Sequence, residues 1–323
     1  MSKKHNPIKV TVVIVNYFCA DQTQELILFL LGIKSSLFDI SIICSDNSND
    51  NKQKVLLKKL SQSTPRITLF FNNQNLGFGN AINAAVHDQT GFDYLLLINP
   101  DVTLKKGSIE QLIHATLSTK AAGIWGGITV TNDNQPDGRH AWREPTLIRS
   151  LVWSIGLKRS IKHDCLIDNY KTTPSTESDV PYPVDSVSGC CMLIAKDVWT
   201  KNRGFDTRFF LYSEEIDFCR RARLNGFQPT TVPKSRLIHK ASYNSVNTSR
   251  LLLLHHAKFI YAKIHHGVIY QLCYRLIIAA GALIRAFTFL AKNRHSSKSW
   301  FHVFHLAIRP TDSFFINKTK RVH

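Results

Sequence analysis

Four short polar segments between residues 16 and 101 have the composition of a ligand-binding site. They are Asn16-Tyr17, Ser45-Asp46-Asn47-Ser48, Asn72-Asn73-Gln74-Asn75 and Asn99-Pro100-Asp101. Each follows an apolar run typical of a buried strand, and an open α/β sheet binds its ligand at the carboxyl ends of its strands. A carboxylate there, such as that of Asp46, can accept hydrogen bonds from a base N–H or a ribose hydroxyl. Each segment alone could be an Asx-turn, but their coincidence favours a ligand site.

Two glycines, Gly77 and Gly79, lie between Asn75 and Asn83, directly ahead of a predicted helix. Glycine allows another chain or a ligand to approach the backbone closely, and the first N–H groups of a helix attract anions. This segment could therefore contact a phosphate. An ordinary turn into a helix would have the same pattern.

An acidic cluster, Glu214, Glu215 and Asp217, begins another predicted helix. A carboxylate held at such a place can serve as a general base. The structural alternative is that Ser213 caps the helix and that the acids only complement the helix dipole. Both interpretations can hold together, because a base at a helix start is held rigidly.

The elements that position these residues alternate between strands and helices. The sequence predicts strands at residues 10–16, 40–44, 67–71, 94–98 and 124–130, and helices at 22–33, 52–60, 77–87 and 108–117. This order predicts βαβ units around a mainly parallel sheet. Residues 132–182 are irregular and rich in proline, so we expect a long lid or an insertion on the acceptor side there.

The order of the motifs resembles family 2 glycosyltransferases and, within them, the bacterial rhamnosyltransferase-like branch. The matching segments are residues 13–17, 46–50, 75–83, 99–101, 188–189, 204–206 and 209–220. The match extends from residue 10 to about residue 245. It implies an inverting enzyme of the GT-A class, with a Rossmann-like α/β fold, that takes a sugar from a nucleoside diphosphate.

The resemblance also implies which residues bind the donor and a divalent cation. The donor-binding residues are Asn16, Asp46, Asn75, Gly77, Asn83, Asn99, Asp101 and Arg220. Asp101 is expected to hold Mg²⁺ or Mn²⁺ against the diphosphate, with Asn99 in place of the first acid of the family's Asp-x-Asp motif. His239 is a further candidate for the cation or the diphosphate, although a single histidine can equally be structural.

In the acidic cluster, the resemblance assigns the catalytic base to Glu215, with Asp217 as the alternative. Glu215 is one methylene longer than the aspartate that is usual in the family. Arg220 follows in the same motif, where it could contact the donor or form a structural ion pair.

The composition is that of a folded protein with a strong positive charge. The chain has 323 residues, 44% of them hydrophobic, with 41 Lys and Arg against 23 Asp and Glu and a net charge of +18. This excludes a wholly disordered or collagen-like chain and favours a polyanionic partner: nucleic acid, anionic lipid or a phosphorylated substrate. The 7 cysteines include no Cys-x-x-Cys pair, and the N-terminus lacks a signal-peptide pattern, so we expect a reducing cytosol.

From residue 251 the chain loses its acids until Asp312, and large apolar residues alternate with basic ones. On a helical wheel the polar residues from Lys263 to Lys292, among them Arg275 and Arg285, share one arc. We therefore predict a catalytic domain at residues 1–250 and, at residues 251–323, a basic amphipathic helical segment that lies on an anionic membrane. The alternative is that this segment packs on the catalytic domain or on a second subunit.

With this basic segment, the resemblance implies an enzyme on the cytoplasmic face of the inner membrane that helps to assemble a cell-surface polysaccharide such as an O-antigen. The expected donor is dTDP-L-rhamnose, with another UDP- or GDP-sugar as the alternative, and the expected acceptor is a lipid-linked saccharide. A nucleotidyltransferase and a non-enzymatic basic binding module are the rivals. No nucleic-acid partner is expected, because the sequence carries no nucleic-acid-binding motif.

Overall fold

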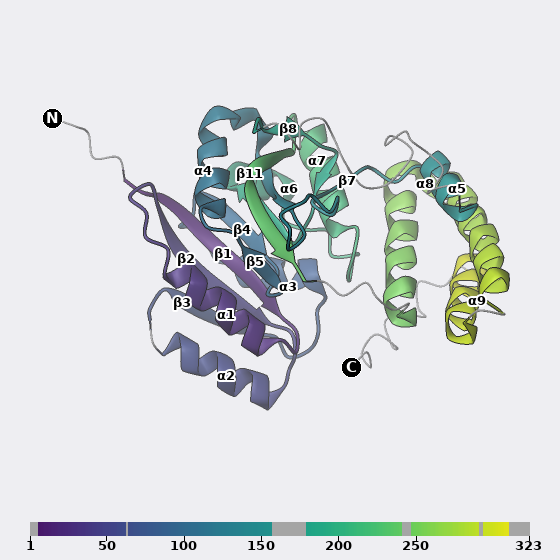
Figure 1. Cartoon of the computed structure of the whole chain (residues 1–323), viewed down its shortest axis with the longest axis horizontal. Helices are drawn as coiled ribbons and strands as arrows, with labels where there is room; N and C mark the ends of the chain where they lie inside the picture. Colours follow the sequence, from purple (N-terminus) through teal and green to yellow (C-terminus); the bar gives the residue numbers. More distant parts are fainter. Residues whose placement is uncertain (1–5, 63, 157–178, 241–246, 291–292, 310–323) are drawn as a thin grey trace. The chain divides into compact units, whose positions relative to one another are not determined.

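The computed structural model describes residues 6–62, 64–156, 179–240, 247–290 and 293–309 (Figure 1). These residues form two compact units. The first contains the sheet and the helices that pack on it. The second contains residues 208–214 and three helices, α5, α8 and α9.

The first unit is built on a sheet with nine strands in the described residues. Their order is β3-β2-β1-β4-β10-β6-β11-β5, and β8 pairs with β11. The bounds are β1 Ile8–Asn16, β2 Phe38–Asp46, β3 Ile67–Phe71, β4 Tyr94–Ile98, β5 Val102–Leu104, β6 Ile124–Thr129, β8 Tyr182–Pro183, β10 Cys191–Ala195 and β11 Thr230–His239. Strands β1, β2, β3, β4, β6 and β11 run in one direction, which confirms the mainly parallel sheet.

Helices cover both faces of this sheet because the central strands are apolar on both sides. In β1, Val12 and Ile14 face one core, and Val13 and Val15 face the other. The first core is closed by α1 Ala20–Leu31, α2 Asn51–Ser61 and α4 Ser108–Ser118. The second is closed by α3 Phe78–Val86, α6 Lys196–Asn202 and α7 Glu214–Leu224. The five predicted strands and four predicted helices are thereby confirmed.

Residues 132–156 and 179–182 are more ordered than the sequence predicts. Strand β7, Ala141–Trp142, pairs with β9, Ser186–Val187, in a separate two-stranded sheet. Before this region, a single turn of 3-10 helix, Lys120–Ala122, precedes β6. Helix α5 occupies Leu147–Ser154, and its N-cap residue Thr146 accepts a hydrogen bond from the Arg149 N–H. Residues 157–178 of the expected lid lie outside the described residues.

In the second unit, α8 spans Thr248–Leu290 and α9 spans Arg294–Ile308. Gly267 has φ 84° and ψ 179°, so α8 is two helical segments, 248–266 and 268–290. The segments fold back on each other, since Gln271 Nε2 donates to the Phe259 carbonyl at 3.0 Å. The continuous helical wheel from 263 to 292 is therefore wrong. Among the described residues, α8 is the helix that is long and apolar enough to cross a membrane. That length is the sum of its two segments, which Gly267 separates.

Candidate active site

The carboxyl ends of β1 and β2 bring Asn16 and Asp46 together, as the sequence predicts. The two residues are paired in the parallel register, and Asn16 Nδ2 donates to Asp46 Oδ1 at 2.8 Å. The same amide lies within hydrogen-bond distance of Ser48 Oγ and Gln53 Oε1. Asn16 therefore orients the Asp46 carboxylate.

Only one of the two Asp46 oxygens is used inside the protein. Oδ1 accepts from Asn16 and from the Ser48 N–H at 3.1 Å, whereas Oδ2 is buried without a hydrogen-bond partner among the described residues. A buried carboxylate oxygen without a partner carries a large desolvation cost. A ribose hydroxyl or a base N–H would satisfy it, so the geometry fits a nucleoside.

Asn75 and Gly77 build the entry to helix α3. Asn75 Oδ1 accepts from the Gly77 N–H at 2.9 Å and from Asn47 Nδ2 at 3.3 Å. Gly77 is the N-cap residue and has φ 82°, a conformation that favours glycine. Asn47 also donates to the Gly77 carbonyl at 3.0 Å and accepts from Asn72. The sequence places Asn47 at a strand end but gives it no role, and here it joins the ends of β2 and β3 to this turn.

Asn83 hydrogen-bonds α3 to a segment that is far away in the sequence. Its Nδ2 donates to the Phe205 carbonyl at 2.8 Å, and its Oδ1 accepts from the Phe205 N–H at 2.9 Å. Both ends of the Asn83 amide are therefore used within the protein. A Cβ at Gly79 would lie 2.9 Å from the Phe205 Cβ, so this glycine permits the close approach of residue 205.

Asp101 and His239, both expected to hold a cation, lie next to each other at the edge of the sheet. His239 ends β11 and is paired in register with Val102 of β5. Its Nε2 lies 3.2 Å from Asp101 Oδ1. Burial would raise the pKa of the Asp101 carboxyl, but the hydrogen bond and charge of His239 and the charge of Arg139 lower it overall.

Arg139 is a residue of this edge that sequence reasoning missed. Its guanidinium donates to the His239 carbonyl at 3.0 Å and forms an ion pair with Asp137 at 2.5 Å. The contact joins segments far apart in the sequence, and Asp137-Gly138-Arg139 has the composition of an ordinary turn, so no sequence signal identifies it. Arg139 holds the end of β11 and adds positive charge beside Asp101.

Asn99 shapes the turn that presents Asp101. Its N–H donates to the Cys190 carbonyl at 3.0 Å, and its own carbonyl accepts from the Val102 N–H at 3.1 Å. No group of three or more His, Cys, Asp or Glu side chains suited to a metal occurs in the described part of the chain. One carboxylate and one imidazole fit a cation that takes its remaining ligands from diphosphate oxygens and water.

Glu215 is the second residue of α7 and lies beside the loop 188–190. A Cβ at Gly189 would lie 3.7 Å from the Glu215 Cβ, and the next residue, Cys190, accepts the Asn99 hydrogen bond. Ser186 Oγ donates to the Glu215 carbonyl at 3.2 Å. Burial of the carboxyl raises the pKa of Glu215 to about 7. A carboxylate with such a pKa can accept a proton near neutral pH.

The other acids and basic residues of α7 have different surroundings. Asp217 is fully buried, and its Oδ2 accepts from Arg221 Nε at 2.8 Å. Arg221 also donates to the Gly204 carbonyl, so this pair joins α7 to the segment held by Asn83. Arg220 is partly buried on the same helix.

The capping alternative for Ser213 is not supported. Ser213 has φ 66° and follows Tyr212, which has φ 72°, and Ser213 Oγ makes no hydrogen bond among the described residues. Two consecutive non-glycine residues in the left-handed region cost about 1–3 kcal/mol each. Such strain directly before an acid-bearing helix is typical of functional sites.

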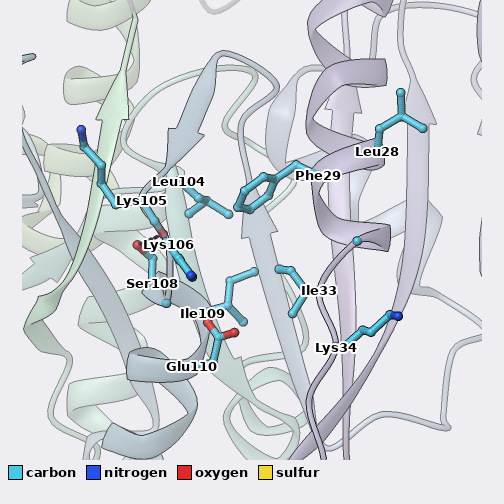
Figure 2. A pocket seen from close by; sticks show the side chains of 12 residues that line it. Leu28, Phe29, Ile33, Lys34, Leu104, Lys105, Lys106, Ser108, Ile109 and Glu110 are labelled. Carbon is cyan, nitrogen blue, oxygen red and sulfur yellow. Dashed lines mark hydrogen bonds between the residues drawn. The ribbon is translucent and has the colours of Figure 1, made fainter.

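One cavity lies apart from these residues. It has a volume of about 490 Å³ and is lined by Leu28 and Phe29 of α1, by Ile33 just after that helix, and by residues 104–110 (Figure 2). The lysines Lys34, Lys105 and Lys106 border it. None of the predicted site residues is among those that line it.

A mainly parallel sheet with helices on both faces and a polar edge of this kind is the GT-A fold of glycosyltransferases. The chain belongs to glycosyl transferase family 2, whose family model matches residues 11–198. It is thus a transferase enzyme, and the non-enzymatic and nucleotidyltransferase rivals are set aside.

Two similar proteins place it in the rhamnosyltransferase-like branch. The N-acetylglucosaminyl-diphospho-decaprenol L-rhamnosyltransferase of Mycobacterium tuberculosis is 26% identical over 244 residues, which cover 71% of this chain and 76% of that protein. The rhamnosyltransferase WbbL of Escherichia coli K12 is 25% identical over 206 residues, which cover 61% and 72%.

A solved structure supports the fold. The crystal structure of GalNAc-T7 with UDP, GalNAc and Mn²⁺ is similar with a TM-score of 0.58 and 14% identity. The match covers 82% of this chain and 53% of that chain, so this chain spans about half its length. At this identity the likeness shows the shared fold.

Proposed function

We propose that the chain transfers L-rhamnose from dTDP-L-rhamnose to a hydroxyl of a lipid-linked saccharide, with inversion at the anomeric carbon. The observation that carries the proposal is the arrangement around the loop 188–190. Glu215, with a pKa of about 7, lies beside Gly189, and the turn that presents Asp101 beside His239 is hydrogen-bonded to Cys190. A base and a diphosphate-binding pair are the two parts that such a transfer needs.

In the reaction, the acceptor oxygen attacks the anomeric carbon while the bond from that carbon to the diphosphate oxygen breaks. The electron pair leaves with the nucleoside diphosphate, and the acceptor proton passes to Glu215. Asp46 would accept a hydrogen bond from the nucleoside at its buried Oδ2. Asp217 is the alternative base, but its carboxylate is already held by Arg221.

Asp101 and His239 would hold a divalent cation, Mg²⁺ or Mn²⁺. When bound, the cation neutralises charge on the diphosphate. The lowered pKa of Asp101 favours the ionised carboxylate that a cation needs. A carboxylate and an imidazole together suit Mn²⁺ at least as well as Mg²⁺. The Mn²⁺ in the GalNAc-T7 structure supports a divalent cation.

The choice of donor and acceptor rests on the names of the similar proteins. Both act as rhamnosyltransferases, and one acts on N-acetylglucosaminyl-diphospho-decaprenol. We therefore propose an N-acetylglucosamine-diphospho-lipid as the class of acceptor, and a peripheral position on the cytoplasmic face of the inner membrane. Donor, acceptor and location follow the predictions from the sequence.

The test is a transfer assay with purified full-length protein, N-acetylglucosaminyl-diphospho-undecaprenol and separate dTDP-rhamnose, UDP-sugar and GDP-sugar donors. We expect dTDP release and a product heavier by one deoxyhexose with dTDP-rhamnose and a divalent cation. NMR of the product would show whether the anomeric configuration is inverted. Transfer from a UDP- or GDP-sugar alone would overturn the donor, and a retained configuration would overturn the single-displacement mechanism.

A further inference from the structure

The segment 268–290 of α8 exposes an apolar stripe along its whole length. The residues on it are Val268, Ile269, Leu272, Cys273, Leu276, Ala280, Ile284, Phe287 and Leu290, and Thr288 is the one polar residue of this segment that is exposed. Ile269 is 80% exposed, Leu276 68% and Phe287 61%. Spacings of three and four residues keep these side chains on one face of the helix. A patch of this size on a soluble surface marks an interaction site.

In the second half of this segment, the side that faces the protein is built from small residues. Ala279, Gly281, Ala282 and Ala286 are buried, and a Cβ at Gly281 would lie 2.5 Å from the Ser154 Cβ of α5. Tyr274 and Ile278 are also buried, but from residue 279 to residue 286 the buried positions are all alanine or glycine, while the large side chains of the apolar stripe point outward. This is the reverse of the pattern in a water-soluble bundle and is typical of helices that face lipid.

The two arginines of this segment do not interrupt the exposed stripe, because both cap neighbouring helices. Arg275 donates to the carbonyls of Leu306 and Ala307, both at 2.8 Å, at the end of α9. Arg285 donates to the carbonyl of Ser154 at 2.8 Å, at the end of α5, and its guanidinium lies 3.8 Å from the Trp153 ring centroid. A positive charge at a helix C-terminus is stabilising. The sequence prediction that put these arginines on the exposed polar face of a membrane helix is therefore wrong.

Helix α9 adds a basic stripe beside the apolar one. Ser297 Oγ donates to the Ala286 carbonyl at 2.8 Å, and the Phe287 and Phe301 rings are 5.8 Å apart, so α9 lies against the segment 268–290 (Figure 1). The exposed residues of α9 include Arg294, His295, Lys298, His302 and His305. The sequence has no acid between residues 218 and 311. Two copies of this surface would repel each other, whereas anionic headgroups would be attracted.

We propose that the second unit binds a bilayer in the membrane plane, with the stripe of 268–290 in the acyl chains and the basic stripe of α9 at anionic headgroups. An in-plane orientation follows because the apolar stripe runs the length of one face while α5 and α9 occupy the other. Helix α5 adds exposed Ile148 and Leu151 to the same unit. The binding mode is thus insertion of a preformed apolar face, and it does not depend on the proposed transfer reaction.

The first experiment measures flotation of the full-length protein with phosphatidylcholine vesicles, with and without phosphatidylglycerol. The test variant carries Ile269→Glu, Leu276→Glu and Phe287→Glu, and we expect its partitioning to fall at least about tenfold. The matched control carries Leu28→Glu, Val55→Glu and Leu117→Glu, at residues 53%, 55% and 53% exposed in the first unit. The control should bind as the unaltered chain does. Circular dichroism and binding of dTDP would confirm that both variants are folded, and equal vesicle binding by the two would overturn the proposal.

A second measurement separates the basic stripe from the apolar one. Arg294→Gln with Lys298→Gln should weaken binding to phosphatidylglycerol vesicles about fivefold per charge removed and leave binding to pure phosphatidylcholine unchanged. If these two changes abolish binding to both kinds of vesicle, charge and not insertion carries the contact. If the unaltered chain forms a dimer that the three glutamates dissociate, and binds no vesicle, a second copy is the partner.

A third measurement distinguishes an in-plane helix from one that crosses the bilayer. A fluorophore is placed at Cys273, or at Ala280→Cys or Phe287→Cys with Cys273→Ser, in a chain carrying Cys165→Ser and Cys19→Ser. Quenchers fixed at different depths on the lipid chains then report the depth of each label. An in-plane helix predicts similar shallow depths at all three positions. A label at 280 that is clearly the deepest would show a crossing helix and overturn the proposal.

Discussion

His239 Nε2 lies 3.2 Å from Asp101 Oδ1, although His239 ends β11 and Asp101 lies in the turn before β5. Arg139 fixes the end of β11, because its guanidinium donates a hydrogen bond to the His239 carbonyl. The imidazole and the carboxylate are partners. Side chains this close could both contact one cation.

We expect Asp101→Ala and His239→Ala each to weaken cation-dependent donor binding, about tenfold or more for removal of one ligand. The double variant should lose less than the product of the two effects, because both side chains act on one ion. Isothermal titration of dTDP, with Mn²⁺ and with chelator, measures each loss. The shared cation would be contradicted if the loss of dTDP affinity in the double variant equalled the product of the two single losses. It would also be contradicted if the unaltered protein bound dTDP equally well with Mn²⁺ and with chelator.

Glu215→Gln should lower kcat by about 10²-fold or more, a usual contribution of a general base, while donor binding is kept. Glutamine has nearly the same shape but cannot take the acceptor proton. Asp217→Asn is the comparison: it disturbs the Arg221 contacts and should reduce stability more than it reduces kcat in the protein that remains folded. Unchanged turnover of Glu215→Gln would remove Glu215 as the base.

The raised pKa of Glu215 also sets a pH dependence. Because the base must be ionised, kcat/KM should fall about tenfold per pH unit below pH about 7. Asp101 cannot produce this fall, since its pKa is lowered from the ordinary value. A pH profile of kcat/KM at saturating cation, compared with that of Asp101→Asn, would test the assignment. A value of kcat/KM that changes by no more than about twofold between pH 5 and 8 would contradict the assignment.

The raised pKa of Glu215 makes folding stability depend on pH in the opposite direction to kcat/KM: stability falls as the pH rises. Between its ordinary value of 4.5 and about 7, the folded protein binds more protons at Glu215 than the unfolded chain does. Stability from this group is therefore greatest at low pH and is lost as the pH rises to about 7. Glu215→Gln should then melt higher than the unaltered protein at pH 8 and show a smaller difference at pH 5, by differential scanning calorimetry. A variant that melts lower at pH 8 would contradict burial of an ionised carboxyl.

Asp46→Asn should weaken binding of dTDP about tenfold or more, because the amide would place a donor or a weaker acceptor at the buried Oδ2 position. Phosphate or diphosphate alone should bind as before, since Asp46 is assigned to the nucleoside. Competition between dTDP and inorganic diphosphate would measure both. Equal loss for the two ligands would place Asp46 at the diphosphate or show a general loss of structure.

The sheet and the strand-end residues could be predicted because they depend on local patterns. Apolar runs identify the strands, and parallel neighbours carry Asn16 and Asp46 to one edge. The contact of Arg139 with His239 could not be predicted, because it depends on the register of β11, which is shifted between Val232 and Arg236. The helical wheel failed at Gly267, where one backbone conformation reversed the direction of the chain.

The arginines of the segment 268–290 illustrate the same limit. A helical wheel predicts on which face of the helix the arginines lie, but it does not predict which other parts of the protein pack against that face. Only the placement of the ends of α5 and α9 shows that Arg275 and Arg285 have carbonyl partners within the protein. The two arginines are thus partly buried against α5 and α9, and the apolar stripe of the segment is exposed.

Gly79→Ala should destabilise the first unit, because its Cβ would lie 2.9 Å from the Phe205 Cβ, an atom that cannot move without the backbone. Overpacking of this kind costs about 1–3 kcal/mol, and the better helix propensity of alanine offsets about 1 kcal/mol of it. Gly91→Ala is the matched control, since nothing lies within 4 Å of its added Cβ. Urea unfolding should give Gly79→Ala a lower midpoint than Gly91→Ala. The displaced Phe205 would also pull on Asn83, so dTDP binding should weaken in Gly79→Ala and not in the control. Equal midpoints would show that α3 and residue 205 can separate freely, and the close approach would then have no role in holding the donor-binding edge.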